Sequence, residues 1–209
     1  MLFPSYAYGL PPIVSRFVKE AVFNTPYIAA FVTYGSNPGG TLSAMRRILK
    51  KKNTDAVFFG RIPSVENYTA MFGPQKAATI ETRTEMQRKA TEEAAGNIIA
   101  RRTNNLNGFH PFSALISKLF TMGIKVFYRH YRLSDECDGC EICKIICPVS
   151  AIVIRENRPV FSEKCEHCQG CVNICPRRAI HFGRVNSKTP VYHHPEISVA
   201  DLARLISLS

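Results

Sequence analysis

The first half of the chain contains three short apolar runs that are typical of buried strands. Leu2-Phe3 lies at the start, and nearly continuous apolar stretches follow at residues 27–34 and 56–59. Strands that are covered on both faces, as in a parallel sheet, show such runs in place of a strict apolar and polar alternation. We therefore expect parallel strands in this part of the chain.

Helix-spaced apolar positions separate these runs. One helix is expected to start at Pro11-Pro12, because proline is tolerated in a first turn, and a second one follows Gly40. An irregular loop is expected at residues 63–73, and a long helical segment at 80–102. The alternation of strands and helices predicts half of a doubly wound α/β sheet. The inward positions expected in the first two helices are Ile13, Val14, Phe17, Val18, Ala21, Val22, Leu42, Met45, Ile48 and Leu49.

Two more helices are expected in the second half of the chain. A basic amphipathic pattern precedes the cysteines and can lie on a membrane surface, but we favour a connecting helix that packs between the two halves. Ser198 and Asp201 form a predicted N-cap pair for a last helix at residues 199–208. The apolar stripe of the connecting helix consists of Phe112, Leu115, Ile116, Leu119 and Phe120.

The composition adds a basic character to this picture. The chain has 209 residues and a formal net charge of +11, which is compatible with nucleic acid, an anionic membrane surface or an acidic protein as partner. No apolar stretch reaches the ~20 residues that cross a bilayer, so we expect a cytoplasmic protein without a transmembrane segment. The densest basic group is interpreted as a solvated helix end, where the helix dipole favours cations; it consists of Arg46, Arg47, Lys50, Lys51 and Lys52.

All eight cysteines lie in two copies of one pattern. Residues 137–148 and 165–176 both read C-x2-C-x2-C-x3-C-P, and a shift of 28 residues superposes them. Three cysteines spaced by two residues reach three irons of one cube, whereas the x3 spacing and the proline carry the fourth away from its own loop. In this bacterial run the fourth cysteine binds the other cluster. We therefore expect two 4Fe-4S clusters, one held by Cys137, Cys140, Cys143 and Cys175, and the other by Cys165, Cys168, Cys171 and Cys147.

Disulfides and zinc are the two alternatives for these cysteines. Disulfides need an oxidising compartment, and no secretory signal is visible. Zinc binds C-x2-C pairs, but a zinc site needs four thiolates and gives no reason for the third C-x2-C step or for the x3-C-P ending. The iron–sulfur interpretation accounts for the whole repeat.

The repeat extends beyond the cysteines. The same shift superposes Ala151 on Ala179 and Ile152 on Ile180, which predicts a duplicated fold with a pseudo-twofold axis. Short apolar runs are expected to form brief strands at 151–154, 159–161 and 179–182, with the turn between the first two at Glu156-Asn157. Residues expected beside a cluster are Tyr128, Tyr131 and Leu133, as a shield, and His167, as a surface neighbour.

Four further stretches, at residues 3–11, 32–40, 62–68 and 192–195, together with the cysteine repeats, carry a family resemblance. The chain resembles proteins of anaerobic microbes in which a flavodoxin-like domain is fused to a two-cluster ferredoxin, and the resemblance covers almost the whole chain. It implies that the loops matching 5–9 and 33–40 face a flavin ring. Complete members would use FMN to convert between one- and two-electron carriers.

The start of the chain departs from that family. Flavodoxin-like domains bind the flavin phosphate with a Thr/Ser/Gly-rich loop after their first strand, whereas this sequence lacks the loop and begins at what looks like the third strand. The strand at Met1–Phe3 would then form an exposed sheet edge. We expect either a fragment, which we favour, or a sheet that a separate polypeptide completes, and we do not expect this chain alone to bind FMN.

The predicted fold class is α/β plus a small α+β part. A partial flavodoxin-like parallel sheet is expected at 1–104, a connecting amphipathic helix at 105–127, and a tail with a short helix at 186–209. Between them, residues 128–185 form a two-cluster ferredoxin-like domain, with repeats at about 128–157 and 156–185.

This architecture predicts an electron carrier. Cubes held by four thiolates have no open iron position, so one-electron transfer to or from a redox partner protein is expected in place of substrate chemistry. One alternative is a subunit of an FMN-dependent oxidoreductase, if the missing flavodoxin half is supplied. The other is a structural or sensing iron–sulfur protein that binds nucleic acid, for which no nucleic-acid-binding signature is found.

Overall fold

The computed structural model describes residues 1–52, 57–105 and 111–207. They form two compact units, each with its own hydrophobic core. Unit 1 comprises Met1–Val65 and Lys76–Thr121, and unit 2 comprises Glu66–Gln75 and Met122–Ser209. The short segment Glu66–Gln75 therefore belongs to unit 2, although the chain on both sides of it belongs to unit 1.

Unit 1 is built on a parallel sheet of three strands, β1 (Leu2–Pro4), β2 (Ile28–Tyr34) and β3 (Val57–Pro63). β2 lies in the middle and pairs with β3 along its whole length. The three predicted runs and their parallel direction are thus confirmed. β3 extends beyond the predicted stretch at 56–59, of which Ala56 lies outside the described residues.

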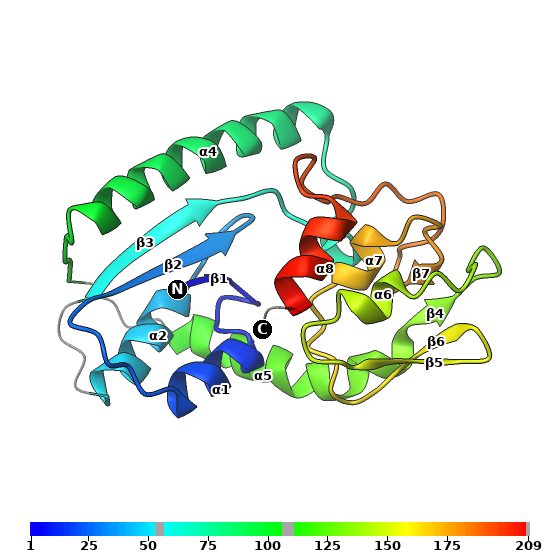
Figure 1. The fold of residues 1–209 in the computed structure, drawn as a ribbon, viewed down its shortest axis with the longest axis horizontal. Helices are drawn as coiled ribbons and strands as arrows, with labels where there is room; N and C mark the ends of the chain where they lie inside the picture. The colour runs from blue at the N-terminus through cyan, green and yellow to red at the C-terminus, as the bar shows by residue number, and fades with distance from the viewer. Residues whose placement is uncertain (53–56, 106–110, 208–209) are drawn as a thin grey trace. The chain divides into compact units, whose positions relative to one another are not determined.

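Helices cover both faces of this sheet (Figure 1). α1 (Pro12–Glu20) and α2 (Thr41–Lys50) lie on one face, and α4 (Ala77–Ile99) lies on the other. This is the layer arrangement expected for half of a doubly wound sheet. The finer assignment to a flavodoxin-like domain stays a prediction. The predicted irregular loop at 63–73 is partly wrong, because it contains the short helix α3 (Thr69–Phe72).

Neighbouring residues of β2 enter two different cores. Val32 packs with Phe3, Val18 and Met45 on the face that α1 and α2 cover. Phe31 packs on the opposite face, in the cluster that contains Ala94 of α4. Since successive strand residues point to opposite faces, a strand buried on both sides must be apolar at every position. This explains the continuous apolar run that predicted β2.

The first helix is shorter than predicted. α1 ends at Glu20, and Ala21 has an extended backbone at φ −60° and ψ 140°, although its N–H still donates to the Phe17 carbonyl. The chain leaves the helix here to reach β2. Val22, which was expected to point inward, lies beyond the helix end and is exposed for this reason. Phe17, also expected to point inward, lies within α1 but is exposed as well, with its ring edge-on to Phe23.

Unit 2 contains two short antiparallel strand pairs. β4 (Arg132–Leu133) pairs with β7 (Ile180–His181), and β5 (Ile152–Arg155) pairs with β6 (Arg158–Phe161). The turn between β5 and β6 has φ values of 48° and 58° at Glu156 and Asn157, as a tight two-residue hairpin requires. The strands and the turn predicted in this region are confirmed.

Short helices in and after the cysteine repeats also belong to unit 2. α6 (Ile142–Ile145) and α7 (Gly170–Ile174) occupy the same place in the two cysteine repeats. α8 (Val199–Ser207) begins at the predicted cap, where the Ser198 N–H donates to Asp201 Oδ2 at 2.9 Å and the Asp201 N–H donates to Ser198 Oγ at 3.1 Å. The position predicted for its last residue, 208, lies outside the described residues.

The connecting helix α5 (Pro111–Phe127) is present, but its apolar residues do not form one buried stripe. Ile116 and Phe120 are half-buried, whereas Phe112 is 75% exposed and Leu119 is 59% exposed. The expectation of a fully packed face was therefore wrong: positions 112, 115 and 119 lie toward one edge of the stripe and are exposed, whereas 116 and 120 lie toward the other edge and are partly covered. Residues 106–110 of the predicted segment lie outside the described residues.

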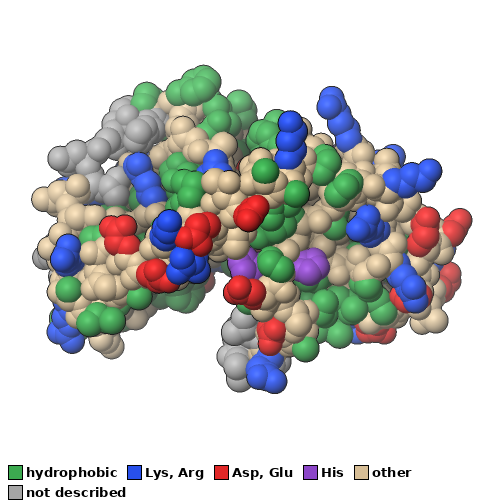
Figure 2. Space-filling model, turned by 90° about the horizontal axis from the view of Figure 1, so that it is seen from above, with side chains coloured by type: hydrophobic (Ala, Val, Ile, Leu, Met, Phe, Trp, Pro, Cys, Tyr) green, Lys and Arg blue, Asp and Glu red, His purple; other side chains and the backbone are tan. Residues whose placement is uncertain are grey.

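Figure 2 shows charged side chains spread over one face of the molecule. On the face shown in Figure 2, lysine and arginine side chains are interspersed with acidic ones. At the end of α2, Lys52 Nζ donates to the Ala21 carbonyl at 2.5 Å and lies 5.9 Å from the centre of the Phe23 ring. This lysine of the predicted basic group thus contacts its own unit. Within the described residues, no helix is long and apolar enough to cross a membrane.

Candidate metal centre

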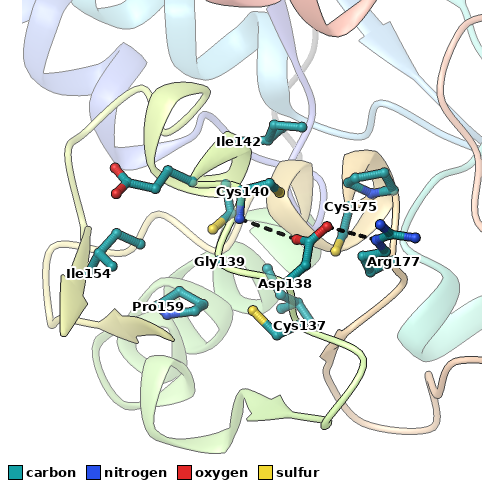
Figure 3. Close-up of a pocket in the computed structure, with 13 residues that line it drawn as sticks. Cys137, Asp138, Gly139, Cys140, Ile142, Ile154, Pro159, Cys175 and Arg177 are labelled. Atoms are coloured by element: carbon teal, nitrogen blue, oxygen red, sulfur yellow. Dashed lines mark hydrogen bonds and ion pairs between the residues drawn. The ribbon is translucent and has the colours of Figure 1, made fainter. Parts of the chain in front are cut away.

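Three cysteines of the first repeat and the last cysteine of the second line one cavity. Cys137, Cys140, Cys143 and Cys175 surround about 370 Å³ of space outside the protein atoms, part of it open to solvent. Figure 3 shows Cys137, Cys140 and Cys175 around the same space, although Cys175 comes from the other repeat. The remaining lining includes apolar side chains, among them Ile154, Pro159 and Ile180.

A second cavity of nearly the same size, about 360 Å³, is lined by the other four cysteines. Cys147 of the first repeat faces it together with Cys165, Cys168 and Cys171 of the second. Cys143 lines both cavities, so the two are neighbours. None of the eight cysteines forms a disulfide.

The duplication extends to backbone geometry. Each last cysteine accepts a hydrogen bond from the alanine four residues later, from the Ala151 N–H to Cys147 Sγ at 3.2 Å and from the Ala179 N–H to Cys175 Sγ at 3.4 Å. Residues with left-handed backbone also recur at the 28-residue shift; the pairs are Gly139 and His167, Glu141 and Gln169, and Ser150 and Arg178. The two loops therefore turn around their cavities in the same way.

Without a nearby cation, the buried thiols ionise less readily than exposed ones. Burial raises the pKa of Cys143 and of Cys168 to about 11, and raises that of Cys171 well above its usual value, and neighbouring thiols add to the effect. Hydrogen bonds from the backbone of Lys144 and of Gly170 partly oppose it. Since the thiolate is the form that binds metal, bound iron would supply the positive charge that stabilises these groups as anions.

The donor set fits an iron–sulfur cube. Four thiols around a largely apolar space are the ligands that such a cube uses. Thiols around a cube bind four different irons and stand further apart than the four thiolates around one zinc ion. Among the described residues, no three His, Cys, Asp or Glu side chains are spaced to hold a single metal ion.

An ion pair joins the two repeats at the first cavity. Arg177 Nε donates to Asp138 Oδ2 at 2.7 Å, and the Cys140 N–H donates to Asp138 Oδ1 at 3.2 Å (Figure 3). The guanidinium, as the main cause, holds the pKa of Asp138 below its usual value. Both side chains are exposed, so water screens the pair and its contribution to stability is small. Sequence reasoning did not identify this pair.

His167 lies between Cys165 and Cys168, which line the second cavity, but it is not the surface residue that was expected. Only 3% of its surface is exposed, because the rings of Phe127 and Phe182 cover it with centroid distances of 4.8 and 4.4 Å. These rings come from distant segments of the chain, which a local pattern does not show. Burial lowers the pKa of His167 to about 4, so the imidazole is neutral at pH 7.

The three residues expected to shield a cluster take different places. Tyr131 lines the second cavity and stacks on Phe161, with ring centres 4.7 Å apart and planes 16° apart. Leu133 packs into the core of unit 2. Tyr128 is instead bound by Arg129, whose Nε donates to its hydroxyl at 3.1 Å.

The comparison with known families agrees with this geometry. Residues 129–176, which include all eight cysteines, match the 4Fe-4S dicluster domain. This segment is a ferredoxin-type 4Fe-4S module. No curated protein and no solved structure matches the chain. The part of the chain before the ferredoxin-type module therefore has no counterpart in these comparisons, and a fusion to a flavodoxin-like domain stays a prediction.

A segment far from the ferredoxin-type module in sequence packs against it. The Tyr68 hydroxyl lies 2.9 Å from His167 Nε2, and Asn173 Nδ2 donates to the Asn67 carbonyl at 3.2 Å. Tyr68 and Asn67 both belong to Glu66–Gln75, the stretch of the loop after β3 that is part of unit 2. No local signal in the sequence pairs this stretch with the cysteines.

Proposed function

We propose that unit 2 binds two 4Fe-4S clusters and that the protein is a one-electron carrier. In this proposal Cys137, Cys140, Cys143 and Cys175 hold the first cluster, and Cys165, Cys168, Cys171 and Cys147 hold the second. The observation that carries it is the grouping of the thiols: each of two equally large cavities is lined by three cysteines of one repeat and the last cysteine of the other. The match to the 4Fe-4S dicluster domain supports the same chemistry.

Electron relay follows from the ligand set. A cube with four thiolate ligands offers no open iron position to a substrate, so its chemistry is to change oxidation state by one electron. The neighbouring cavities would let an electron pass between the clusters. Cys140 is exposed, whereas Cys168, at the equivalent position of the second repeat, is only partly exposed. We therefore infer that a redox partner protein exchanges electrons at the first cluster.

Metal analysis and reduction test this function directly. Protein prepared without oxygen should contain about eight irons and about eight acid-labile sulfides per chain, and dithionite should bleach its colour reversibly. A preparation that holds about two zinc ions and no sulfide would exclude the iron–sulfur proposal. Iron that never changes oxidation state would exclude electron transfer.

Two matched serine variants test the ligand sets. Cys147→Ser should damage the cluster built on Cys165, Cys168 and Cys171, whereas Cys175→Ser should damage the other one. Each variant should retain one intact cluster, that is about four of eight irons, and the two remaining clusters should differ in their electron paramagnetic resonance spectra. Loss of the cluster on the same repeat as the replaced cysteine would overturn the crossed assignment.

A further inference from the structure

The duplicated positions around the two cavities are not chemically equivalent. The shift of 28 residues places Pro159 of the first cavity opposite Tyr131 of the second. Proline offers no hydrogen-bond donor, whereas the phenol of tyrosine has one O–H. The two cavities therefore differ at this position in their ability to donate a hydrogen bond to a cluster ligand.

Two side chains can act as donors to the Tyr131 hydroxyl oxygen. Gln169 Nε2 donates to it at 2.9 Å, and His167 Nδ1 lies 3.0 Å away. A phenol oxygen accepts two hydrogen bonds and donates one. If Gln169 and His167 both donate, the phenol proton is left for an acceptor in the second cavity, which Tyr131 and Cys165 both line.

The hydrogen bond with Tyr68 bears on which ring nitrogen of His167 carries the proton. Its hydroxyl lies 2.9 Å from His167 Nε2, so both ring nitrogens of this buried imidazole have a tyrosine partner. A neutral imidazole has one N–H and one acceptor nitrogen. When Tyr68 donates to Nε2, the ring proton must be on Nδ1, and Nδ1–H then donates to Tyr131. One proton direction thus runs from Tyr68 through His167 and Tyr131 into the cavity that Cys165 lines.

The surrounding packing holds this arrangement in place. Tyr131 is stacked on Phe161, and the Tyr68 ring meets the His167 ring edge-on with centroids 5.4 Å apart. His167 and Gln169 are each 3% exposed, so bulk water does not compete for their hydrogen bonds. Replacing either tyrosine by phenylalanine keeps these ring contacts and removes only the hydroxyl.

We propose that Tyr131 donates a hydrogen bond to the Cys165 thiolate and thereby raises the reduction potential of the second cluster, with His167 and Tyr68 as positioning residues. The inference rests on the proposed function, since it needs a cluster at Cys165. Reduction adds negative charge that spreads onto the ligand sulfurs, so a donor at sulfur stabilises the reduced state more than the oxidised state. The first cluster has Pro159 at this position and lacks the corresponding donor.

Redox titration of the full chain, followed by electron paramagnetic resonance, tests the proposal. Tyr131→Phe should lower the potential of one cluster only, the one that Cys147→Ser damages. We expect about a tenfold fall in its equilibrium constant for reduction, which is about 59 mV for one electron. Tyr68→Phe should shift the same cluster in the same direction but less, since His167 can then accept the Tyr131 proton at Nδ1.

Tyr192→Phe is the matched control. The Tyr192 hydroxyl is buried and has no hydrogen-bond partner among the described residues, so its removal should leave both potentials unchanged. Two clusters with unchanged potentials in Tyr131→Phe, or equal shifts of both, would overturn this inference and leave the electron-carrier function standing. Failure of the unaltered chain to bind any cluster would instead refute the proposed function. If Tyr131→Phe does not take up its second cluster, Tyr68→Phe decides the inference by the same criterion.

Discussion

Gly139→Ala should weaken the first cluster site selectively. Gly139 lies between Cys137 and Cys140 and has a φ of 75°, in the left-handed region that disfavours a side chain. A Cβ atom built there lies 3.1 Å from the carbonyl oxygen of Asn157. Asn157 is itself left-handed, in the two-residue turn between β5 and β6, so its carbonyl has little freedom to move away.

The expected cost has two parts. Placing a Cβ in the left-handed region costs about 1–2 kcal/mol, and the tight contact with Asn157 should add about 1 kcal/mol. The variant should still fold, because His167, at the equivalent position of the second repeat, has a φ of 55° with a full side chain. A total of about 2–3 kcal/mol would favour the state in which the ligand loop 137–143 has opened. At tenfold for each 1.4 kcal/mol, that state would be roughly 30 to 150 times more populated.

The assay is the rate at which an iron chelator removes each cluster from the anaerobic protein. Gly139→Ala should lose its first cluster faster by about the factor above, whereas the second cluster should be removed at the unaltered rate. Gly183→Ala is the control, since φ there is 57° but the nearest atom to a Cβ is 3.4 Å away. Gly183→Ala should cost only the free energy of placing a Cβ in the left-handed region, and this position lies away from the cysteines in the sequence. Equal acceleration for both clusters in Gly139→Ala would refute the reasoning.

Three further predictions concern the two units. Met45→Ala, at a fully buried core position of unit 1, should lower the free energy of unfolding of that unit by about 2–5 kcal/mol, seen as a lower thermal midpoint with unchanged iron content. Ser198→Ala should cost α8 about 1 kcal/mol through the lost cap, seen as faster amide exchange at 199–204. Removing iron with a chelator should raise amide exchange throughout 129–185 but leave β2 protected, because metal bonds replace much of the core in so short a segment.

The cysteine chemistry was readable from the sequence because its constraints are local. Three ligands lie within seven residues of each other in each repeat, and the turns that present them recur at Glu141 and Gln169. The parallel sheet was equally readable, since burial on both faces forces a continuous apolar run. The domain boundaries, the ligand sets, the redox partner and a cytoplasmic location stay predictions.

Long-range packing was not readable in this way. Helical spacing placed Val22 inside α1, but the chain had already turned toward β2 at Ala21. Spacing also placed Phe112 and Ile116 in one apolar stripe of α5, but it did not show that Phe112 is exposed and Ile116 half-buried. In each case the pattern identified an element, whereas the side it buries depends on segments that the pattern does not contain.

His167 shows which further signal the sequence does carry. Its burial depends on Tyr68, Phe127 and Phe182, three rings from separate segments, and no local rule brings these together. Yet the repeat aligns His167 with Gly139 and Tyr131 with Pro159. A duplicated site needs the same residues twice only for the function that both copies share. Positions where one copy has a polar donor and the other has none are therefore where the two proposed clusters would differ, and the alignment of the repeats alone singles out Tyr131 and His167.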